Sequence, residues 1–200
     1  MPPIEEHPLQ PFLPCNARLL MLGSFPPPRE RWCMEFFYPN PQNDMWRLWG
    51  WIYFGDKNYF FDTATKKFRL HLLRPFLETV GVALYDTAQA VRRMKGNAQD
   101  AHLEVVRATD IKRLTQQLPM LQAIAVTGQK AADTIIHQLC NDPLEAKKLQ
   151  SELKIGHWVQ VSNLRLWRMP SSSRSYPLAL EKKAEYYKAM LLHEGMLTIS

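Results

Sequence analysis

Cysteine is scarce in this sequence. The chain has three cysteines, Cys15, Cys33 and Cys140, which are widely separated and form no C-x-x-C pair. That small number excludes a four-cysteine zinc or iron–sulfur site within one chain, and it argues against a disulfide framework. The histidines never stand three or four residues apart, so a metal site would have to be assembled from distant segments.

Long apolar runs are also missing. The uninterrupted apolar stretches span only a few residues each, whereas a membrane-spanning helix needs ~20. Residues 1–7 carry neither the basic nor the apolar segment of a secretory signal peptide. We therefore expect a soluble, cytoplasmic protein that does not associate with a membrane.

Several common catalytic motifs are absent. The sequence contains no phosphate-binding G-x-x-x-x-G-K-[ST], no dinucleotide-binding G-x-G-x-x-G, no G-x-S-x-G nucleophile elbow and no zinc-binding H-E-x-x-H. These absences argue against one hypothesis for the chain, an unrelated flavodoxin-like or hydrolase-like α/β protein.

What the sequence does contain is an ordinary globular composition with an excess of positive charge. Its 200 residues are 46% apolar and 22% charged, which is enough for one well-cored domain over residues 1–200. The net charge of +6 and the isoelectric point near 9.3 indicate a polyanionic partner, nucleic acid before an acidic membrane surface.

Short apolar runs alternate with amphipathic patterns along the chain. The runs predict buried strands at residues 19–22, 82–85, 124–126 and 158–161. The amphipathic patterns predict helices at residues 45–52, 68–76, 111–118, 132–139 and 180–191. This alternation indicates an α/β fold, a three-layer α/β/α domain with a central, mostly parallel, four-stranded sheet.

In a parallel sheet of this kind, the active crevice lies beyond the carboxyl ends of the strands. That rule selects the segments 23–43, 86–100, 127–130 and 163–174. The first of them has the most distinctive pattern. A buried strand ends at Gly23, a proline-stiffened loop follows, and a Tyr-x-x-Pro-x-Asn-x-x-Trp element over residues 38–46 opens a helix.

This arrangement resembles the uracil-DNA glycosylase superfamily, especially its hypoxanthine-DNA and mismatch-specific branches. Further segments are similar to the family in the same order along the chain, namely 81–87, 95–100, 124–131 and 169–173. The resemblance covers about residues 17–192. It implies a DNA glycosylase of base excision repair, which hydrolyses the N-glycosidic bond of a base flipped out of the duplex.

The resemblance also implies roles for particular residues. Asn43 matches the asparagine that is held to be catalytic, although a simple helix N-cap is the competing interpretation. Tyr38 matches the aromatic residue that stacks on the base, or it is a loop tyrosine packed on the core. The remaining expected contacts are a base cradle of Gly23, Ser24, Phe25 and Pro26 and a DNA-binding loop of Ser171, Ser172, Ser173 and Arg174.

Two positions depart from the family pattern. Phe25 stands where members that activate water have Asp or Asn, and Met169 stands where other members have a catalytic histidine. One hypothesis is therefore a monomeric, monofunctional glycosylase for uracil or hypoxanthine that needs neither metal nor cofactor. Another is a catalytically impaired nucleic-acid-binding module of the same fold. Either would bind phosphates through basic residues near the crevice, of which the sequence offers Arg29, Arg31, Arg47, Arg168 and Arg174.

Overall fold

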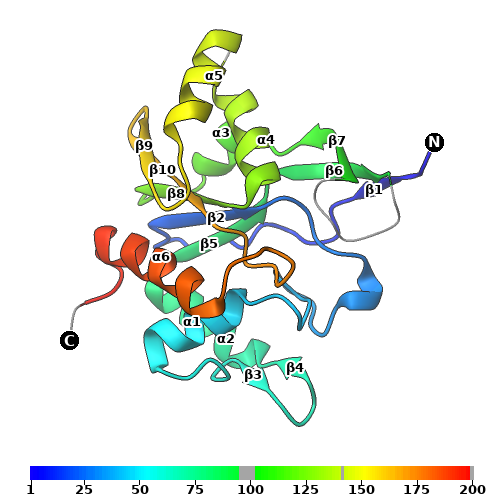
Figure 1. Ribbon diagram of the computed structural model, residues 1–200, viewed down its shortest axis with the longest axis vertical. Helices are drawn as coiled ribbons and strands as arrows, with labels where there is room; N and C mark the ends of the chain where they lie inside the picture. The colour runs from blue at the N-terminus through cyan, green and yellow to red at the C-terminus, as the bar shows by residue number, and fades with distance from the viewer. Residues whose placement is uncertain (95–101, 141, 199–200) are drawn as a thin grey trace.

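A computed structural model describes residues 1–94, 102–140 and 142–198. Its centre is a five-stranded sheet in the order β5-β2-β8-β10-β9 (Figure 1). The strands are β5 (Val82–Asp86), β2 (Leu19–Gly23), β8 (Ala123–Thr127), β10 (Leu164–Met169) and β9 (Trp158–Val161). Neighbours among the first four are parallel, and β9 is antiparallel to β10. All four predicted runs lie in this one sheet.

The prediction of four strands was wrong by one, because β10 was missed. Its sequence places Arg165 and Arg168 among apolar residues, so it lacks the unbroken apolar run of the other parallel strands. The structure satisfies Arg165 with Glu194, a residue far along the chain. The predicted run at 158–161 is instead an edge strand that alternates between exposed and half-buried residues. Within the predicted crevice segment 163–174, residues 164–169 are therefore strand.

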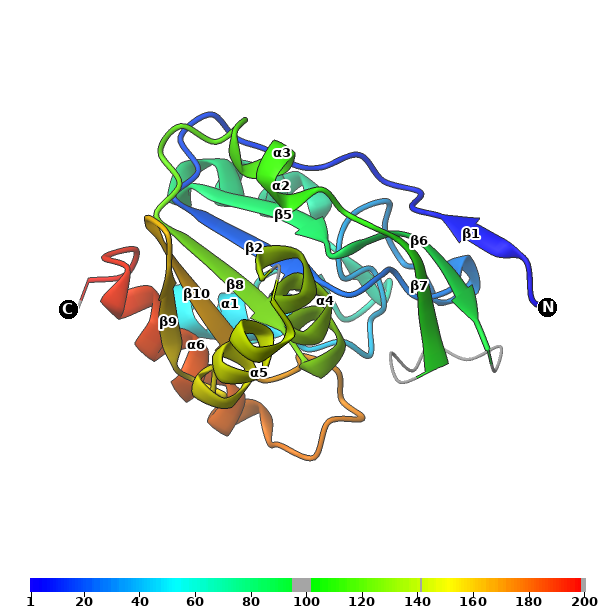
Figure 2. The same cartoon turned by 90° about the horizontal axis from the view of Figure 1, so that it is seen from above.

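Helices cover both faces of the sheet, which confirms the predicted three layers. Figures 1 and 2 show α1 (Met45–Phe54), α2 (Leu70–Val80) and α6 (Leu180–His193) on one face. The other face carries α3 (Ile111–Thr115), α4 (Gln129–Leu139) and α5 (Pro143–Glu152). The sequence analysis missed α5, although Asp142 caps it by accepting a hydrogen bond from the Leu144 amide.

A second, antiparallel sheet lies beyond the end of β5. It has the order β1-β6-β7, with β1 (Ile4–Glu6), β6 (Ala88–Arg93) and β7 (Leu103–Ala108) (Figure 2). Its buried side chains form a small core with Phe25, which ties the N-terminal segment to the loop after β2. A short hairpin, β3 (Phe61–Asp62) and β4 (Lys67–Phe68), completes the strands of the described residues.

The aromatic residues that crowd the sequence between 25 and 61 belong mainly to the core. Trp46, Trp49 and Phe60 are at most 1% exposed, and Phe36 packs against both Phe37 and Trp46. Burying each such ring contributes roughly 1.5–3 kcal/mol, so this segment anchors α1 to the sheet. None of the helices within the described residues combines the length and the hydropathy that a bilayer crossing requires.

Candidate functional site

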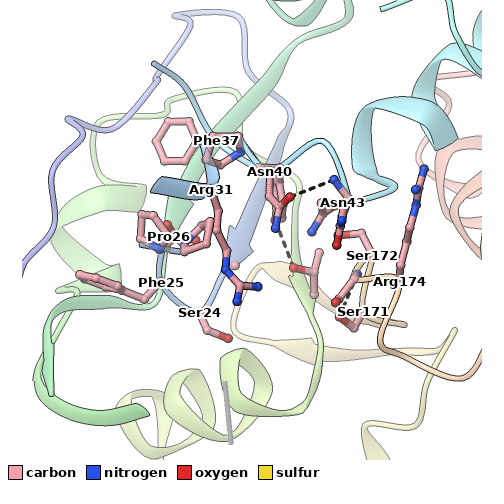
Figure 3. A pocket seen from close by; sticks show the side chains of 18 of the residues that line it. Ser24, Phe25, Pro26, Arg31, Phe37, Asn40, Asn43, Ser171, Ser172 and Arg174 are labelled. Carbon is pink, nitrogen blue, oxygen red and sulfur yellow. Dashed lines mark hydrogen bonds between the residues drawn. The ribbon is translucent and has the colours of Figure 1, made fainter. Parts of the chain in front are cut away.

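The strand order creates a pocket at the carboxyl end of the central sheet. From β2 the chain passes to β5 on one side and later to β8 on the other, so the strand order reverses between β2 and β8. Open α/β sheets bind ligands at such a switch point. Gly23, Asp86 and Thr127 end three of the parallel strands, and Ser171 follows the fourth by two residues. All four residues line a cavity of about 290 Å³ (Figure 3).

The structure brings every predicted site residue to this cavity. Its lining includes Gly23, Ser24, Phe25, Pro26, Tyr38, Asn43, Ser171, Ser172, Ser173 and Arg174. Their grouping is a structural observation, whereas their roles stay predictions. The predicted segment 95–100 lies outside the described residues. Met169 is 1% exposed and does not line the cavity, so no polar group from that position reaches it.

Asp86 and His7 form a buried pair beside the cavity, and sequence reasoning assigned neither a role. His7 Nε2 donates to Asp86 Oδ2 over 2.8 Å, and both side chains are less than a tenth exposed. Asp86 Oδ1 lies so close to β2 that a Cβ at Gly23 would come within 2.4 Å of it. Glycine is therefore required there. The position of Asp86 directly after a predicted strand is the signal that could have identified it.

Tyr38 and Phe25 form aromatic parts of the pocket lining. Tyr38 adopts φ +50°, which is unusual for a non-glycine residue and costs about 1–3 kcal/mol. Its hydroxyl lies 3.1 Å from Thr127 Oγ1, and its ring meets Trp46 edge-on. Tyr38 thus lines the pocket and packs on the core at once. Phe25 is 9% exposed and packs into the second core, with the His7 ring edge-on to it.

Asn43 precedes the N-cap residue of α1, Asp44, and caps the first turn of the helix with one side of its amide. Its Oδ1 accepts a hydrogen bond from the Met45 amide over 2.9 Å, at the start of α1. Among the described residues the other amide atom, Nδ2, has no hydrogen-bond partner. The capping contact fixes the side chain at the pocket wall, and it leaves a donor beside the positive end of the helix dipole.

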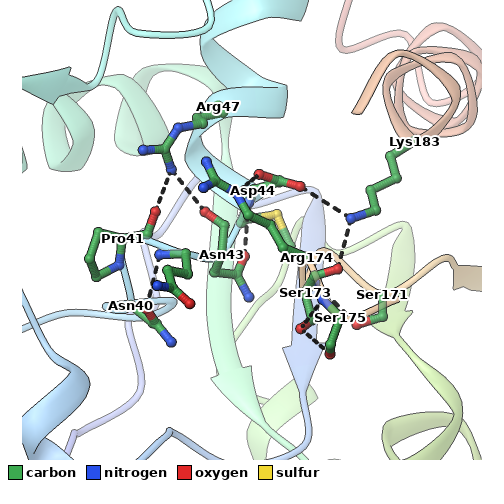
Figure 4. Close-up of polar contacts among 12 residues, drawn as sticks. Asn40, Pro41, Asn43, Asp44, Arg47, Ser171, Ser173, Arg174, Ser175 and Lys183 are labelled. Carbon is green, nitrogen blue, oxygen red and sulfur yellow. Dashed lines mark hydrogen bonds and ion pairs between the residues drawn. The ribbon is translucent and has the colours of Figure 1, made fainter. Parts of the chain in front are cut away.

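A buried carboxylate joins the start of α1 to the serine loop, residues 171–175 (Figure 4). Asp44 Oδ1 accepts from Arg174 Nε over 2.8 Å, and Asp44 Oδ2 accepts from Lys183 Nζ over 3.2 Å. The same Lys183 Nζ donates to Ser173 O over 2.8 Å, and the Asp44 amide donates to Ser172 O over 2.9 Å. These contacts hold the serine loop against the pocket.

Tyr187 fixes the beginning of the serine loop from below. Its hydroxyl donates to Pro170 O over 3.0 Å from a fully buried position on α6. Burial raises the pKa of Tyr187 well above its usual value, so the hydroxyl keeps the proton that this hydrogen bond needs. The polar groups of the pocket are amides, hydroxyls, guanidinium groups and the Asp86 carboxylate. Across the described ranges no three His, Cys, Asp or Glu residues are grouped as metal ligands.

Comparison with known proteins gives a match at the level of structure. No protein-family model and no curated protein sequence matches the chain. The fold is similar to the solution NMR structure of a putative uracil DNA glycosylase from Methanosarcina acetivorans, with a TM-score of 0.62 and 22% sequence identity. The match covers 96% of this chain and 99% of the other. The chain has a uracil-DNA glycosylase-like fold. The fold predicted from the sequence resemblance is therefore confirmed.

The ion pairs of Asp44 with Arg174 and Lys183 lead to a testable prediction about stability. Lys183→Met leaves a buried carboxylate without its buried cation, so we expect a loss of ~3–5 kcal/mol in the free energy of unfolding. Arg174→Ala removes a half-exposed partner, and we expect a loss of at most ~1 kcal/mol. Urea unfolding of both variants measures the difference. Equal losses in the two variants would contradict the expectation that the buried Lys183 stabilises Asp44 more than the half-exposed Arg174 does.

Proposed function

We propose that the protein is a monofunctional DNA glycosylase that removes a deaminated base, uracil or hypoxanthine, from DNA. The observation that carries the proposal is the convergence of all ten predicted site residues on one pocket at the switch point of a glycosylase-like fold. The pocket volume of about 290 Å³ lies near the lower end of the range of small-molecule sites. That size suits a single flipped base.

The Asp86 carboxylate supports a deaminated base as the substrate. Deamination of cytosine or adenine turns a ring nitrogen that accepts hydrogen bonds into an N–H donor, and it turns the amino group into a carbonyl. A flipped base is read along this edge. A carboxylate only accepts hydrogen bonds, so Asp86 Oδ1 pairs with the new N–H of the deaminated base. In cytosine and adenine the same ring nitrogen is an acceptor, so the carboxylate disfavours them.

Asn43 supplies a hydrogen-bond donor that can stabilise the departing base during the reaction. Cleavage of the N-glycosidic bond leaves negative charge on the departing base and positive charge on the sugar. The Asn43 Nδ2 donor and the N-terminus of α1 are fixed before the substrate arrives, and such preorganised dipoles stabilise developing negative charge. Tyr38 and Phe25 supply the aromatic surface against which the base lies.

A non-catalytic binding module is the second candidate function. The observation that favours it is the apolar character of two positions, Phe25 in the pocket wall and Met169 in the core, where other members of the family carry polar groups. Such a module would bind the same DNA and leave the base in place.

A panel of oligonucleotide duplexes separates the two functions. Each duplex carries uracil, hypoxanthine, xanthine or one of the four normal bases at one position, and alkali then cuts the strand at any abasic site. Thymine and guanine belong in the panel because they carry the same N–H and carbonyl pair. We expect cutting at uracil or hypoxanthine. Binding without cutting at any base would contradict catalysis and support the binding module.

Substitution of Asn43 tests its role in the reaction. We expect Asn43→Ala to lower the single-turnover rate by ~10²-fold or more, with little change in affinity for duplex DNA. If Asn43 only caps α1, the substitution costs ~1 kcal/mol of stability and leaves the rate unchanged. Asn43→Asp is the matched variant, because aspartate caps as well but brings negative charge to the departing base. A folded Asn43→Ala protein with the wild-type rate would contradict the catalytic role.

Substitution of Asp86 tests how the base is read. Asp86→Asn removes the negative charge and replaces one of the two acceptor oxygens with an N–H₂ donor. We expect the excision rate on the preferred base to fall by ~10²-fold or more, because the charged acceptor for the N–H of the base is lost from a closed site. Asp110→Asn is the control, since Asp110 caps α3 away from the pocket. A wild-type rate for Asp86→Asn would contradict base reading by this carboxylate.

A further inference from the structure

Two cations line the pocket, and their surroundings differ. Arg174 donates to the buried carboxylate of Asp44, which also accepts from Lys183, so the Arg174 guanidinium is held in an ion pair. Arg31 lines the same pocket from the loop that follows β2. Its side chain has no ion pair or hydrogen bond with any residue that the structure describes. Figure 3 shows the Arg31 side chain among the other side chains that line the pocket, and Arg31 is exposed.

The other arginines that the sequence placed near the crevice are occupied. Arg29 is paired with Glu35 and stacks on Trp32, and it does not line the pocket. Arg47 is 7% exposed and donates to the carbonyls of Pro41 and Asn43. Arg168 donates to Leu153 O and to the Gln129 side chain. Among the arginines of the crevice, Arg31 alone in the described chain has a guanidinium that is free for a ligand.

The backbone presents Arg31 from a rigid turn. Three prolines at 26–28 fix their φ angles ahead of the short 3-10 helix Arg29–Arg31. The Arg31 amide donates to Pro28 O over 3.0 Å, and Trp32 Nε1 donates to Pro27 O over 2.7 Å. A backbone held in this way loses little further chain entropy when its arginine side chain binds an anion.

We propose that Arg31 binds the DNA phosphate next to the flipped nucleotide. The inference rests on the proposed function and adds to it a specific contact. When the base enters the pocket, its sugar stays at the opening and the adjoining phosphate lies beside the rim. A guanidinium there binds two phosphate oxygens at once, and the hydroxyls of Ser171 and Ser173 line the other side of the same pocket. Arg31 thus adds a phosphate contact to the DNA-binding loop that the sequence predicts at residues 171–174.

Binding measurements test this contact. The DNA is a duplex with a tetrahydrofuran abasic-site analogue, and the proteins are wild type, Arg31→Ala, Arg31→Lys and the control Arg113→Ala, each verified as folded by circular dichroism. Arg113 is an exposed residue of α3 that does not line the pocket. We expect Arg31→Ala to bind about tenfold more weakly, with the slope of log affinity against log salt reduced by about 0.9. Arg31→Lys keeps the salt slope but loses part of the affinity, and Arg113→Ala matches wild type. Equal affinity and slope for Arg31→Ala and Arg113→Ala would overturn the proposal.

Replacing single phosphates of the DNA with uncharged groups locates the phosphate that Arg31 contacts. A methylphosphonate replaces, one at a time, each phosphate that flanks the analogue, which removes the charge of that group. Wild type loses about tenfold in affinity at one of these positions, and Arg31→Ala loses nothing further there. Similar losses for both proteins at every position would overturn the proposal. So would a slower single-turnover rate for Arg31→Ala with unchanged affinity, because that result assigns Arg31 to the departing base.

These results are distinct from a failure of the proposed function. If wild type excises a base from the oligonucleotide panel while Arg31→Ala binds like Arg113→Ala, the phosphate contact is wrong and the glycosylase function stands. If wild type binds the duplex through Arg31 but excises no base from the panel, the contact stands and the catalytic function is wrong. If wild type neither binds nor excises, both are wrong.

Discussion

Asp44 is a buried carboxylate held between two cations, Arg174 and Lys183. A carboxylate in that position is stable only while its charge is matched, so the start of α1, the serine loop and α6 must meet at one point. That meeting places Asn43, next to Asp44 in the chain, and the serine loop in a common pocket. The geometry of the site therefore depends on an ion cluster that itself does no chemistry.

The sheet supplies the other half of the pocket. Four parallel strands end side by side, and the reversal of strand order between β2 and β8 opens the space above them. Because position 23 is glycine, Asp86 Oδ1 can lie against β2 at the pocket floor. The floor thus presents an acceptor and the start of α1 presents a donor. Together they are complementary to the N–H and carbonyl edge of a deaminated base, which is the basis of the proposed substrate.

Local patterns in the sequence predicted much of this arrangement. Strands β2, β5 and β8 contain unbroken apolar runs, so the local sequence alone predicted them, without knowledge of the strands they pair with. The pocket followed from the rule that parallel strands carry sites at their carboxyl ends. The resemblance to glycosylases supplied the candidate residues, and the structure groups all of them.

What the sequence did not reveal depends on contacts between distant residues. Strand β10 contains arginines, one of which is paired with Glu194 just after α6, and no local pattern encodes that pair. His7 meets Asp86 across 79 residues of chain. Arg174 and Arg31 look alike as basic residues near a crevice, and only the structure shows that Arg174 is paired with Asp44 and that Arg31 has no ion pair among the described residues.

The central claim is that this pocket releases a base from DNA. Mass spectrometry of the small molecules released from a duplex that contains uracil or hypoxanthine tests it most directly, with enzyme in excess and no alkali added. The account predicts one equivalent of intact free base together with an uncut sugar–phosphate backbone. Bound duplex with no free base in solution would contradict it.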